Sequence, residues 1–322
     1  MSPGSKTWQP TASLARLRQR AALVERARRF FAARGLLEVE TPLLVAAPVT
    51  DVNLHSARVM LAGRSEPLWL QTSPEYAMKR LLAGGSGDIW QLARVVRGAE
   101  RSRLHNAEFS LLEWYRVGYS MPALIDEVAA LCAELMGARR CESLRYADVF
   151  QQHTGLDPLD CADTQLRSQA ATLALSDSTL ASLSRDEMLD LCMALRIGPM
   201  LGRSSFTFVT HYPASQAALA RLDPGDPRVA LRFELYADGI ELANGFVELA
   251  DSALQRQRFE ADNRERIRRG YPAQPLDGHL LEALQAGLPD CAGVALGFDR
   301  VVMIACGAQK IDEVIAFPME RA

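Results

Sequence analysis

The sequence predicts an α+β fold in which an antiparallel sheet is flanked by helices. Runs of alternating apolar residues, typical of strands, lie among stretches in which apolar residues recur at helical spacing. Two strand runs are joined directly by Asp238-Gly239, which is a strong hairpin signal. This order of elements favours α+β over a doubly wound parallel sheet. The 322 residues, 48% of them hydrophobic, can bury a sizeable core.

The first expected element is a helix that begins after Ser13, a suitable N-cap, and ends at Gly35. Its apolar residues at helical spacing are Leu17, Val24, Ala27 and Phe31. A short extended segment should follow, because the residue before Pro42 is disfavoured in the helical region.

Residues 67–119 are expected to form strands around one helix. This helix is capped around Ser73, has Pro74 at its first position and ends at Gly84-Gly85. Residues 89–98 form a β-rich run, and residues 105–119 mix aromatic and aliphatic side chains in near-alternation. A further helix is expected over 122–137.

Residues 144–200 contain short helical pieces broken by Asp-Pro, Ser-rich and Gly-Pro steps, and we interpret them as a helical insertion. Strands return at 206–213 and 229–249. A charged helix then begins at Asp251 and ends at Gly270. The region 291–308 reads as a glycine-punctuated strand that runs into a helix.

Composition and charge exclude several classes of protein. A net charge of −3 and an isoelectric point near 6.0 argue against a sequence-independent grip on nucleic acid. The six cysteines include no CxxC pair, so neither a zinc ribbon nor a thioredoxin-type redox pair is encoded. The first residues form no apolar leader, and no run approaches the roughly 18 apolar residues of a membrane span. We therefore expect a cytoplasmic protein with no membrane partner.

The two commonest phosphate-binding motifs, GxGxxG and GxxxxGK[ST], are absent. A bound nucleotide would have to be held by side chains, and arginine suits this role because its planar fork bonds two phosphate oxygens. Arg94, Arg97 and Arg300 are candidates because each lies beside a glycine or a strand end. For any one of them, a solvated surface position is the simpler alternative.

Two carboxylates, Glu241 and Glu248, could bind Mg²⁺ together with phosphate oxygens. Residues seven apart on a simple strand point to opposite faces, so a shared site requires a bulge or bend, which we expect near Asn244-Gly245. The alternative is that both are exposed charges at a strand edge.

Glu75 falls in the first turn of its helix, where the helix dipole favours a carboxylate in any protein. Its functional alternative is recognition of a substrate ammonium group. His105 has no Ser or Cys partner in the sequence that would suggest nucleophilic catalysis. Phe109, Trp114 and Tyr115 are core residues by default, although one of them could stack on a nucleobase.

Several segments in order resemble the catalytic core of class II aminoacyl-tRNA synthetases, specifically the lysyl branch. They are GLLEVETPLL (motif 1), TSPEYAMKRLL, RVVRGAERSRLHNAEFSLLEWYR (motif 2), GIELANGFVEL and GVALGFDRVVM (motif 3). Within that branch the chain is most similar to the elongation factor P lysine ligases, which are truncated paralogues. Only about a dozen residues precede the first expected helix, so we expect no N-terminal OB-fold for an anticodon, and Ser73 and Ala295 also favour the paralogues. We therefore expect a single catalytic domain over 1–322, with the insertion at 144–200.

The resemblance implies a division of labour among residues. The ATP-binding set is Arg97, Gly98, Ala99, Asn106, Phe109, Glu241, Leu242, Gly297 and Arg300. Within it, Arg97 and Arg300 are the catalytic pair, on the α- and γ-phosphates, and Phe109 stacks on adenine. The amino-acid pocket is formed by Ser73, Pro74, Glu75, Tyr115 and Glu248. Glu241 and Glu248 hold Mg²⁺.

The implied reaction is activation of (R)-β-lysine, or lysine, as an acyl-adenylate by ATP and transfer to a lysine of elongation factor P. Positioning and electrostatic stabilisation suffice, because the substrate carboxylate is already ionised and pyrophosphate leaves readily. The resemblance also implies a homodimer through motif 1 and no tRNA partner.

Motif 2 departs from the family pattern Phe-Arg-Asn-Glu-Glu. The arginine is kept as Arg97, but the acid that contacts adenine falls on Ala99, and Glu100 points to the opposite face of an extended strand. Ala107 and Val247 replace a proline and a histidine. Two alternatives therefore remain: a stand-alone lysyl-tRNA synthetase core that charges tRNA or another acceptor, and a non-catalytic paralogue that senses an amino acid or nucleotide.

Overall fold

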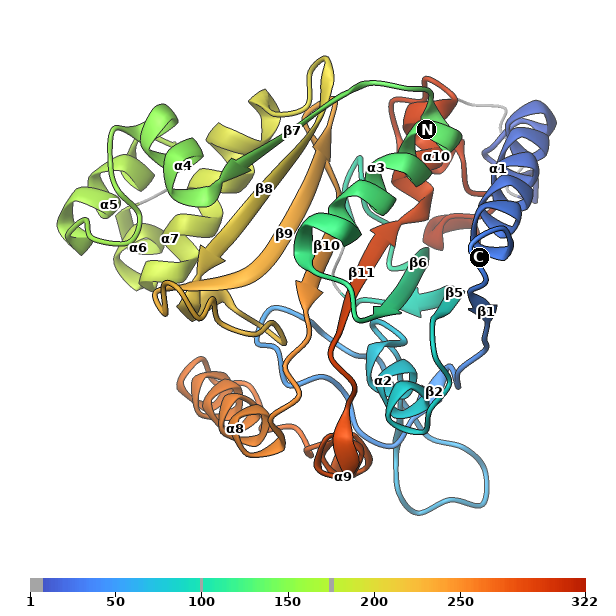
Figure 1. Cartoon of the computed structure of the whole chain (residues 1–322), viewed down its shortest axis with the longest axis horizontal. Coiled ribbons are helices and arrows are strands. Elements are labelled where there is room, and N and C mark those ends of the chain that lie inside the picture. The colour runs from blue at the N-terminus through green and yellow to red at the C-terminus, as the bar shows by residue number, and fades with distance from the viewer. Residues whose placement is uncertain (1–7, 99–100, 174–176) are drawn as a thin grey trace. The chain divides into compact units, whose positions relative to one another are not determined.

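The structure is a computed structural model that describes residues 8–98, 101–173 and 177–322 (Figure 1). The chain divides into two compact units. The first comprises Met1–Tyr119, Ala130–Gly137 and Ala250–Ala322, and the second comprises Ser120–Ala129 and Ala138–Leu249. Each unit combines strands with helices, which confirms the predicted α+β class.

The strands of the first unit form a sheet in the order β1-β5-β6-β11. They are β1 (Leu37–Glu38), β5 (Ile89–Val96), β6 (Glu108–Val117) and β11 (Cys291–Gly297). The neighbours β5, β6 and β11 are antiparallel, as predicted, whereas β1 joins β5 in parallel. Parallel neighbours need a crossover in the chain, and α2 (Glu75–Ala83) lies between β1 and β5. A smaller sheet has the order β2-β4-β3, from β2 (Leu44–Val45), β4 (Leu68–Leu70) and β3 (Arg58–Val59).

The helix boundaries of the first unit follow their capping residues. Its further helices are α1 (Leu14–Ala32), α8 (Ser252–Arg268), α9 (Gly278–Gly287) and α10 (Phe298–Ala305). The side chains of Ser13 and Asp251 accept hydrogen bonds from backbone N–H groups in the first turns of α1 and α8, which confirms both predicted caps. Pro74 is the N-cap of α2 rather than its first residue, a shift of one position from the prediction.

One face of the first sheet packs on α1 through aromatic side chains. Phe31 of α1 stacks on Trp90 of β5, with 4.8 Å between ring centroids, and lies 5.3 Å from the ring of Trp114 on β6. Trp90 and Trp114 are directly paired across β5 and β6, so both project from the same face. The opposite face of the sheet is therefore the one on which a site can form.

The strands of the second unit have the order β10-β9-β8-β7. They are β7 (Arg140–Arg145), β8 (Ser205–Pro213), β9 (Val229–Ala237) and β10 (Ile240–Val247). Asp238 and Gly239 join β9 to β10 with positive φ angles of 54° and 74°, as the tight turn requires, so the predicted hairpin is confirmed. α3 (Met121–Met136) contributes to both units.

Helices pack on β8 in the second unit (Figure 1). They are α4 (Tyr146–Thr154), α5 (Asp163–Ala171), α6 (Asp177–Ser182) and α7 (Arg185–Cys192), followed by the short turns η1 (Met193–Ile197) and η2 (Gly198–Met200). Buried Phe150, Leu166 and Leu189 share one apolar cluster with Val209 and Tyr212 of β8. That residues 144–200 are an insertion into a single domain stays a prediction.

Candidate active site

The site face of the first unit is set by the register of β6 with its two neighbours. Phe109, Leu111, Glu113 and Tyr115 alternate along β6 and project from the face opposite Trp114. Their partners on the neighbouring strand β11 are small residues: Leu111, Glu113 and Tyr115 are paired with Gly297, Ala295 and Gly293, respectively. A strand without bulky side chains on this face leaves room for a ligand beside Glu113 and Tyr115.

Glu113 is the centre of a polar cluster that the sequence did not single out. Its side chain is 1% exposed, and it accepts hydrogen bonds from the hydroxyl groups of Tyr115 at 2.7 Å and Ser73 at 2.8 Å. Ser73 Oγ also accepts a hydrogen bond from the backbone N–H of Glu75 at 3.0 Å. The predicted pocket residues Ser73 and Tyr115 are thus brought together by a third residue.

Glu75 is paired with a protein cation. Its Oε1 lies 2.6 Å from Nζ of Lys79, one turn further along α2, and the Lys79 side chain is only 1% exposed. A carboxylate at this position of α2 therefore does bind an ammonium group. Recognition of a substrate ammonium by Glu75 stays a prediction.

Arg97 follows β5 directly and lies over an aromatic ring. Its guanidinium carbon is 5.2 Å from the centroid of the Phe109 ring, and its Nε donates to the backbone carbonyl of Thr72 at 3.2 Å. At the next position, a Cβ on Gly98 would lie 3.1 Å from the carbonyl oxygen of His55, so the backbone passes close to that residue. Ala99 and Glu100 lie outside the described residues.

His105 contacts Arg300 and feels the charge of Arg97, the two arginines that were assigned to phosphate. Its Nε2 is 2.6 Å from an Nη of Arg300, and its Nδ1 is 2.6 Å from Ser102 Oγ. Burial, followed by the positive charges of Arg300 and Arg97, lowers the pKa of His105 to about 4. The ring is therefore neutral at pH 7, so Nε2 can accept a hydrogen bond from Arg300 while Nδ1 carries the ring proton and donates to Ser102 Oγ. Arg97 and Arg300 create a local positive field on this side of the sheet.

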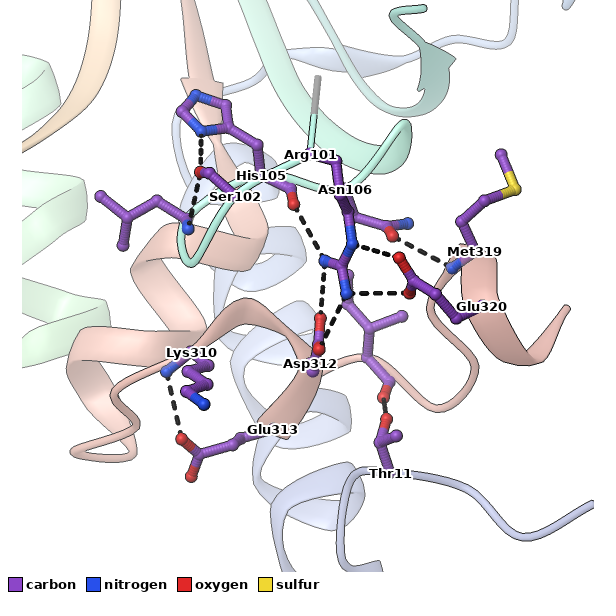
Figure 2. Close-up of polar contacts among 12 residues, drawn as sticks. Thr11, Arg101, Ser102, His105, Asn106, Lys310, Asp312, Glu313, Met319 and Glu320 are labelled. Atoms are coloured by element: carbon purple, nitrogen blue, oxygen red, sulfur yellow. Dashed lines mark hydrogen bonds and ion pairs between the residues drawn. The ribbon is translucent and has the colours of Figure 1, made fainter. Parts of the chain in front are cut away.

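Asn106 and the start of α10 are fixed by contacts within the protein. Asn106 is 3% exposed; its amide donates to the carbonyl of Glu108 at 2.6 Å and accepts from the backbone N–H of Met319 at 3.1 Å (Figure 2). Gly297 is the N-cap of α10, and Arg300 lies in the first turn of that helix. Buried Asp299 accepts from the backbone N–H of Ser110 at 2.7 Å and also pairs with Arg20, which ties α10 to β6 and α1.

The carboxylates predicted to hold Mg²⁺ lie in the second unit. The register of β10 with β9 shifts between Glu241 and Ala243, so Leu242 is the extra residue of a β-bulge. The bend is therefore not near Asn244-Gly245 as predicted. One extra residue restores the alternation and places Glu241, Asn244 and Phe246 on one face, the face toward which Glu248 continues.

Gly245 is required for packing rather than for a bend. It is paired with Phe233 on β9, and a Cβ at this position would lie 2.4 Å from the Phe233 ring. Glu241 is half-buried, whereas Leu242 and Glu248 are 2% and 3% exposed. Both side chains offer oxygen ligands of the kind that Mg²⁺ prefers, and binding of one ion by the pair stays a prediction. Within the described ranges, no group of three or more His, Cys, Asp or Glu side chains is arranged for a metal ion.

The sequence matches the family described as tRNA synthetases class II (D, K and N) over residues 8–321. The chain belongs to this family. It is 51% identical over 320 residues to the elongation factor P–(R)-β-lysine ligase of Salmonella arizonae and 52% identical over 320 residues to the protein of that name from Klebsiella pneumoniae. Each comparison covers 98% of this chain and 98% of the relative.

Within this class II synthetase chain, the described residues of the first unit form two groups. Ser73, Glu75 and Tyr115 gather around Glu113 and Lys79. Arg97 and Arg300 act on His105, and Arg97 lies over the ring of Phe109. Glu241, Leu242 and Glu248 belong to the second unit, and their participation in the same site stays a prediction. The alternating pattern of β6 could have identified Glu113, because it shares the face of Tyr115.

Proposed function

We propose that this chain is an ATP-dependent ligase that activates (R)-β-lysine as an acyl-adenylate and transfers it to a lysine side chain of elongation factor P. The observation that carries the proposal is the identity of 51–52% over nearly the whole chain to enzymes named for this substrate pair. The polar groups around Glu113 and His105 support it, because they offer carboxylates for the ammonium groups of a diamino acid and cations for phosphates.

In the first step, the substrate carboxylate attacks the α-phosphorus of ATP, a bond forms between them, and pyrophosphate leaves. Arg97 would stabilise the charge that develops on the α-phosphate, and Arg300 would hold the γ-phosphate. Gly98 and Asn106 belong to the loop that would surround the nucleotide, Phe109 would stack on adenine, and Gly297 would let the nucleotide approach the backbone of β11. No general base is needed, because the attacking carboxylate is already ionised.

The amino acid would be recognised by carboxylates and hydroxyl groups. Ser73, Glu75, Glu113 and Tyr115 lie on the loop before α2, on α2 and on β6, and Glu248 would complete the set. Pro74 fixes the backbone that leads from Ser73 into α2. Because Ala295 is paired with Glu113 across β11 and β6, its size controls the space beside that carboxylate.

Mg²⁺ would be held by Glu241 and Glu248, and it would neutralise phosphate charge when bound. Leu242 would place the backbone of the β10 bulge beside the nucleotide. These carboxylates are oxygen ligands, which the ion prefers, and the bulge gives them a common face.

In the second step, the ε-amine of a lysine of elongation factor P attacks the acyl carbon, an amide bond forms, AMP leaves, and the amine loses a proton. We also propose a cytoplasmic homodimer that does not charge tRNA. Its interface would include the motif 1 edge of the first sheet, where Leu37 and Leu43 are 56% and 43% exposed. No helix in the described part of the chain is long and apolar enough to cross a bilayer.

ATP–pyrophosphate exchange with (R)-β-lysine and α-lysine side by side tests the proposal. Exchange that is faster with (R)-β-lysine supports the ligase. Absence of exchange with both amino acids would favour a sensor, and preference for α-lysine together with tRNA charging would favour a synthetase core.

A further inference from the structure

Arg101, at the start of the loop that carries His105, is held by the C-terminal segment. Its guanidinium group donates to both oxygens of Asp312, at 2.9 and 3.0 Å, and to both oxygens of Glu320, one of them at 2.8 Å (Figure 2). A fifth hydrogen bond, 3.2 Å long, runs from Nη1 to the backbone carbonyl of His105. Because an arginine has five N–H donors, every donor of Arg101 is used.

Further contacts join the same loop to the same segment. The guanidinium of Arg103 donates to the carbonyl of Gln309 at 2.9 Å, and the backbone N–H of Ile311 donates to the carbonyl of Arg103 at 2.9 Å. The backbone N–H of Met319 donates to Asn106. The loop 101–106 is thus bound at both ends and in its middle by residues 309–320, which include the turn η4 (Ile311–Glu313) and the start of η5 (Met319–Arg321).

The C-terminal segment is itself anchored to the start of the chain. Thr11 donates to the carbonyl of Ile315 through its hydroxyl and to that of Ala316 through its backbone N–H, both at 2.9 Å. Arg16 of α1 pairs with Glu313. The carboxylates that hold Arg101 therefore belong to a fixed support and not to a free tail.

The loop connects this support to the side chains assigned to phosphate. Ser102 and His105 exchange backbone hydrogen bonds of 3.3 Å, and the Ser102 hydroxyl contacts the His105 ring, so the four residues form a tight turn. His105 in turn contacts Arg300. A continuous chain of contacts therefore runs from Asp312 and Glu320 through Arg101 and His105 to Arg300.

We infer that Arg101 is a positioning residue for ATP, which acts by holding the turn that sets His105 against Arg300. The inference rests on the proposed function for the identity of the nucleotide. Arg101 does not act as a phosphate ligand itself, because its donors are already satisfied by Asp312 and Glu320. Asp312 and Glu320 are as necessary as Arg101 itself, since they hold its guanidinium group away from the phosphates that Arg300 would bind.

Arg228 is a matched control for a surface arginine between carboxylates. It donates to both oxygens of Asp226, at 3.0 and 2.9 Å, and to Asp160 at 3.3 Å, on a turn that contributes no predicted site residue. Exposed ion pairs of this kind add little to folding stability. Removal of Arg101 and removal of Arg228 should thus change the midpoint of thermal unfolding by similar amounts. Only removal of Arg101 should weaken the binding of ATP.

The test compares Arg101→Gln, the double variant Asp312→Asn/Glu320→Gln, the combined triple variant and Arg228→Gln. The Kd of a non-hydrolysable ATP analogue is measured by calorimetry, and the KM values for ATP and the amino acid by pyrophosphate exchange. Because small misplacements of a binding group are costly, the Kd and KM for ATP should rise on the order of 10-fold in Arg101→Gln and in the double variant. The KM for the amino acid should not change.

The triple variant should bind ATP no more weakly than the weaker binder of Arg101→Gln and the double variant, because the three side chains act as one unit. Arg101→Lys should bind ATP more tightly than Arg101→Gln but less tightly than the wild type, since lysine keeps the positive charge but lacks the planar guanidinium group. If Arg101→Gln binds the ATP analogue as tightly as the control variant Arg228→Gln does, the inference is overturned. A loss in Arg101→Gln without a loss in the double variant would also overturn it, and would make Arg101 a direct ligand. If the wild type shows no exchange, the proposed function fails, while the calorimetric Kd still decides the role of Arg101.

Discussion

The polar cluster around Glu113 and the turn around His105 lie in the same unit but are held by different forces. Glu113 and Tyr115 lie on β6, which is hydrogen-bonded on both sides by β5 and β11. The turn of Ser102–His105 precedes β6 and is held through Arg101, whose partners Asp312 and Glu320 lie 211 and 219 positions further along the chain. Backbone hydrogen bonds between strands hold Glu113 and Tyr115, for which we propose binding of the amino acid. Partly exposed ion pairs hold the turn of His105, for which we propose a role at the phosphates, and such pairs weaken with salt.

The largest effect is expected for Arg97→Ala on the phosphate side. Loss of a group that stabilises developing charge should lower pyrophosphate exchange by about 100- to 1,000-fold. The amino acid should still bind with unchanged affinity, as measured by calorimetry without ATP. Exchange at a rate close to that of the wild type would show that Arg97 does not contact the α-phosphate.

A smaller loss is expected for Glu113→Gln in the polar cluster. Hydrogen bonds to charged groups contribute about 1.5–3 kcal/mol, so the KM for (R)-β-lysine should rise by about 10- to 100-fold while that for ATP stays constant. Tyr115→Phe is the matched variant, and it should have the smaller effect because the carboxylate remains. A rise in the KM for ATP in either variant would contradict the separation of the two sides.

The sequence predicted the elements well wherever a local rule decides the outcome. The caps at Ser13 and Asp251 and the Asp238-Gly239 turn depend on neighbouring residues alone. The bulge at Leu242 was misplaced because it depends on the pairing of β10 with β9, and Gly245, which suggested a bend, is instead packed under Phe233. Arg101 was missed because its partners are distant in the chain, and nothing in the local pattern indicates them.

A moderate gain is expected for Ala99→Glu, which restores the acid that family members use for adenine. One regained hydrogen bond should tighten ATP binding by about 10-fold. Calorimetry with the ATP analogue measures this, and Ala99→Gln separates the charge from the size of the side chain. Weaker binding in Ala99→Glu would mean that motif 2 has adapted to a different nucleotide contact.

The smallest effect is expected for the pH dependence of folding stability, to which the neutral ring of His105 contributes. Its pKa is about 4 in the folded protein, against about 6.5 in an unfolded chain, so the unfolded state binds more protons between these values. Stability contributed by the neutral ring is complete above pH 6.5 and is lost as the pH falls toward 4. Urea unfolding at pH 7 and pH 5 should show a larger loss for the wild type than for His105→Asn, and equal losses would contradict the assignment.

Transfer to the protein acceptor tests the central claim most directly. Elongation factor P is incubated with the enzyme, ATP and (R)-β-lysine, and its intact mass and modified peptide are determined by mass spectrometry. We predict the mass of one β-lysyl group on a single lysine, formed only with active enzyme and lost in Arg97→Ala. An unmodified acceptor, under conditions in which pyrophosphate exchange shows that adenylate is formed, would contradict the proposed ligase.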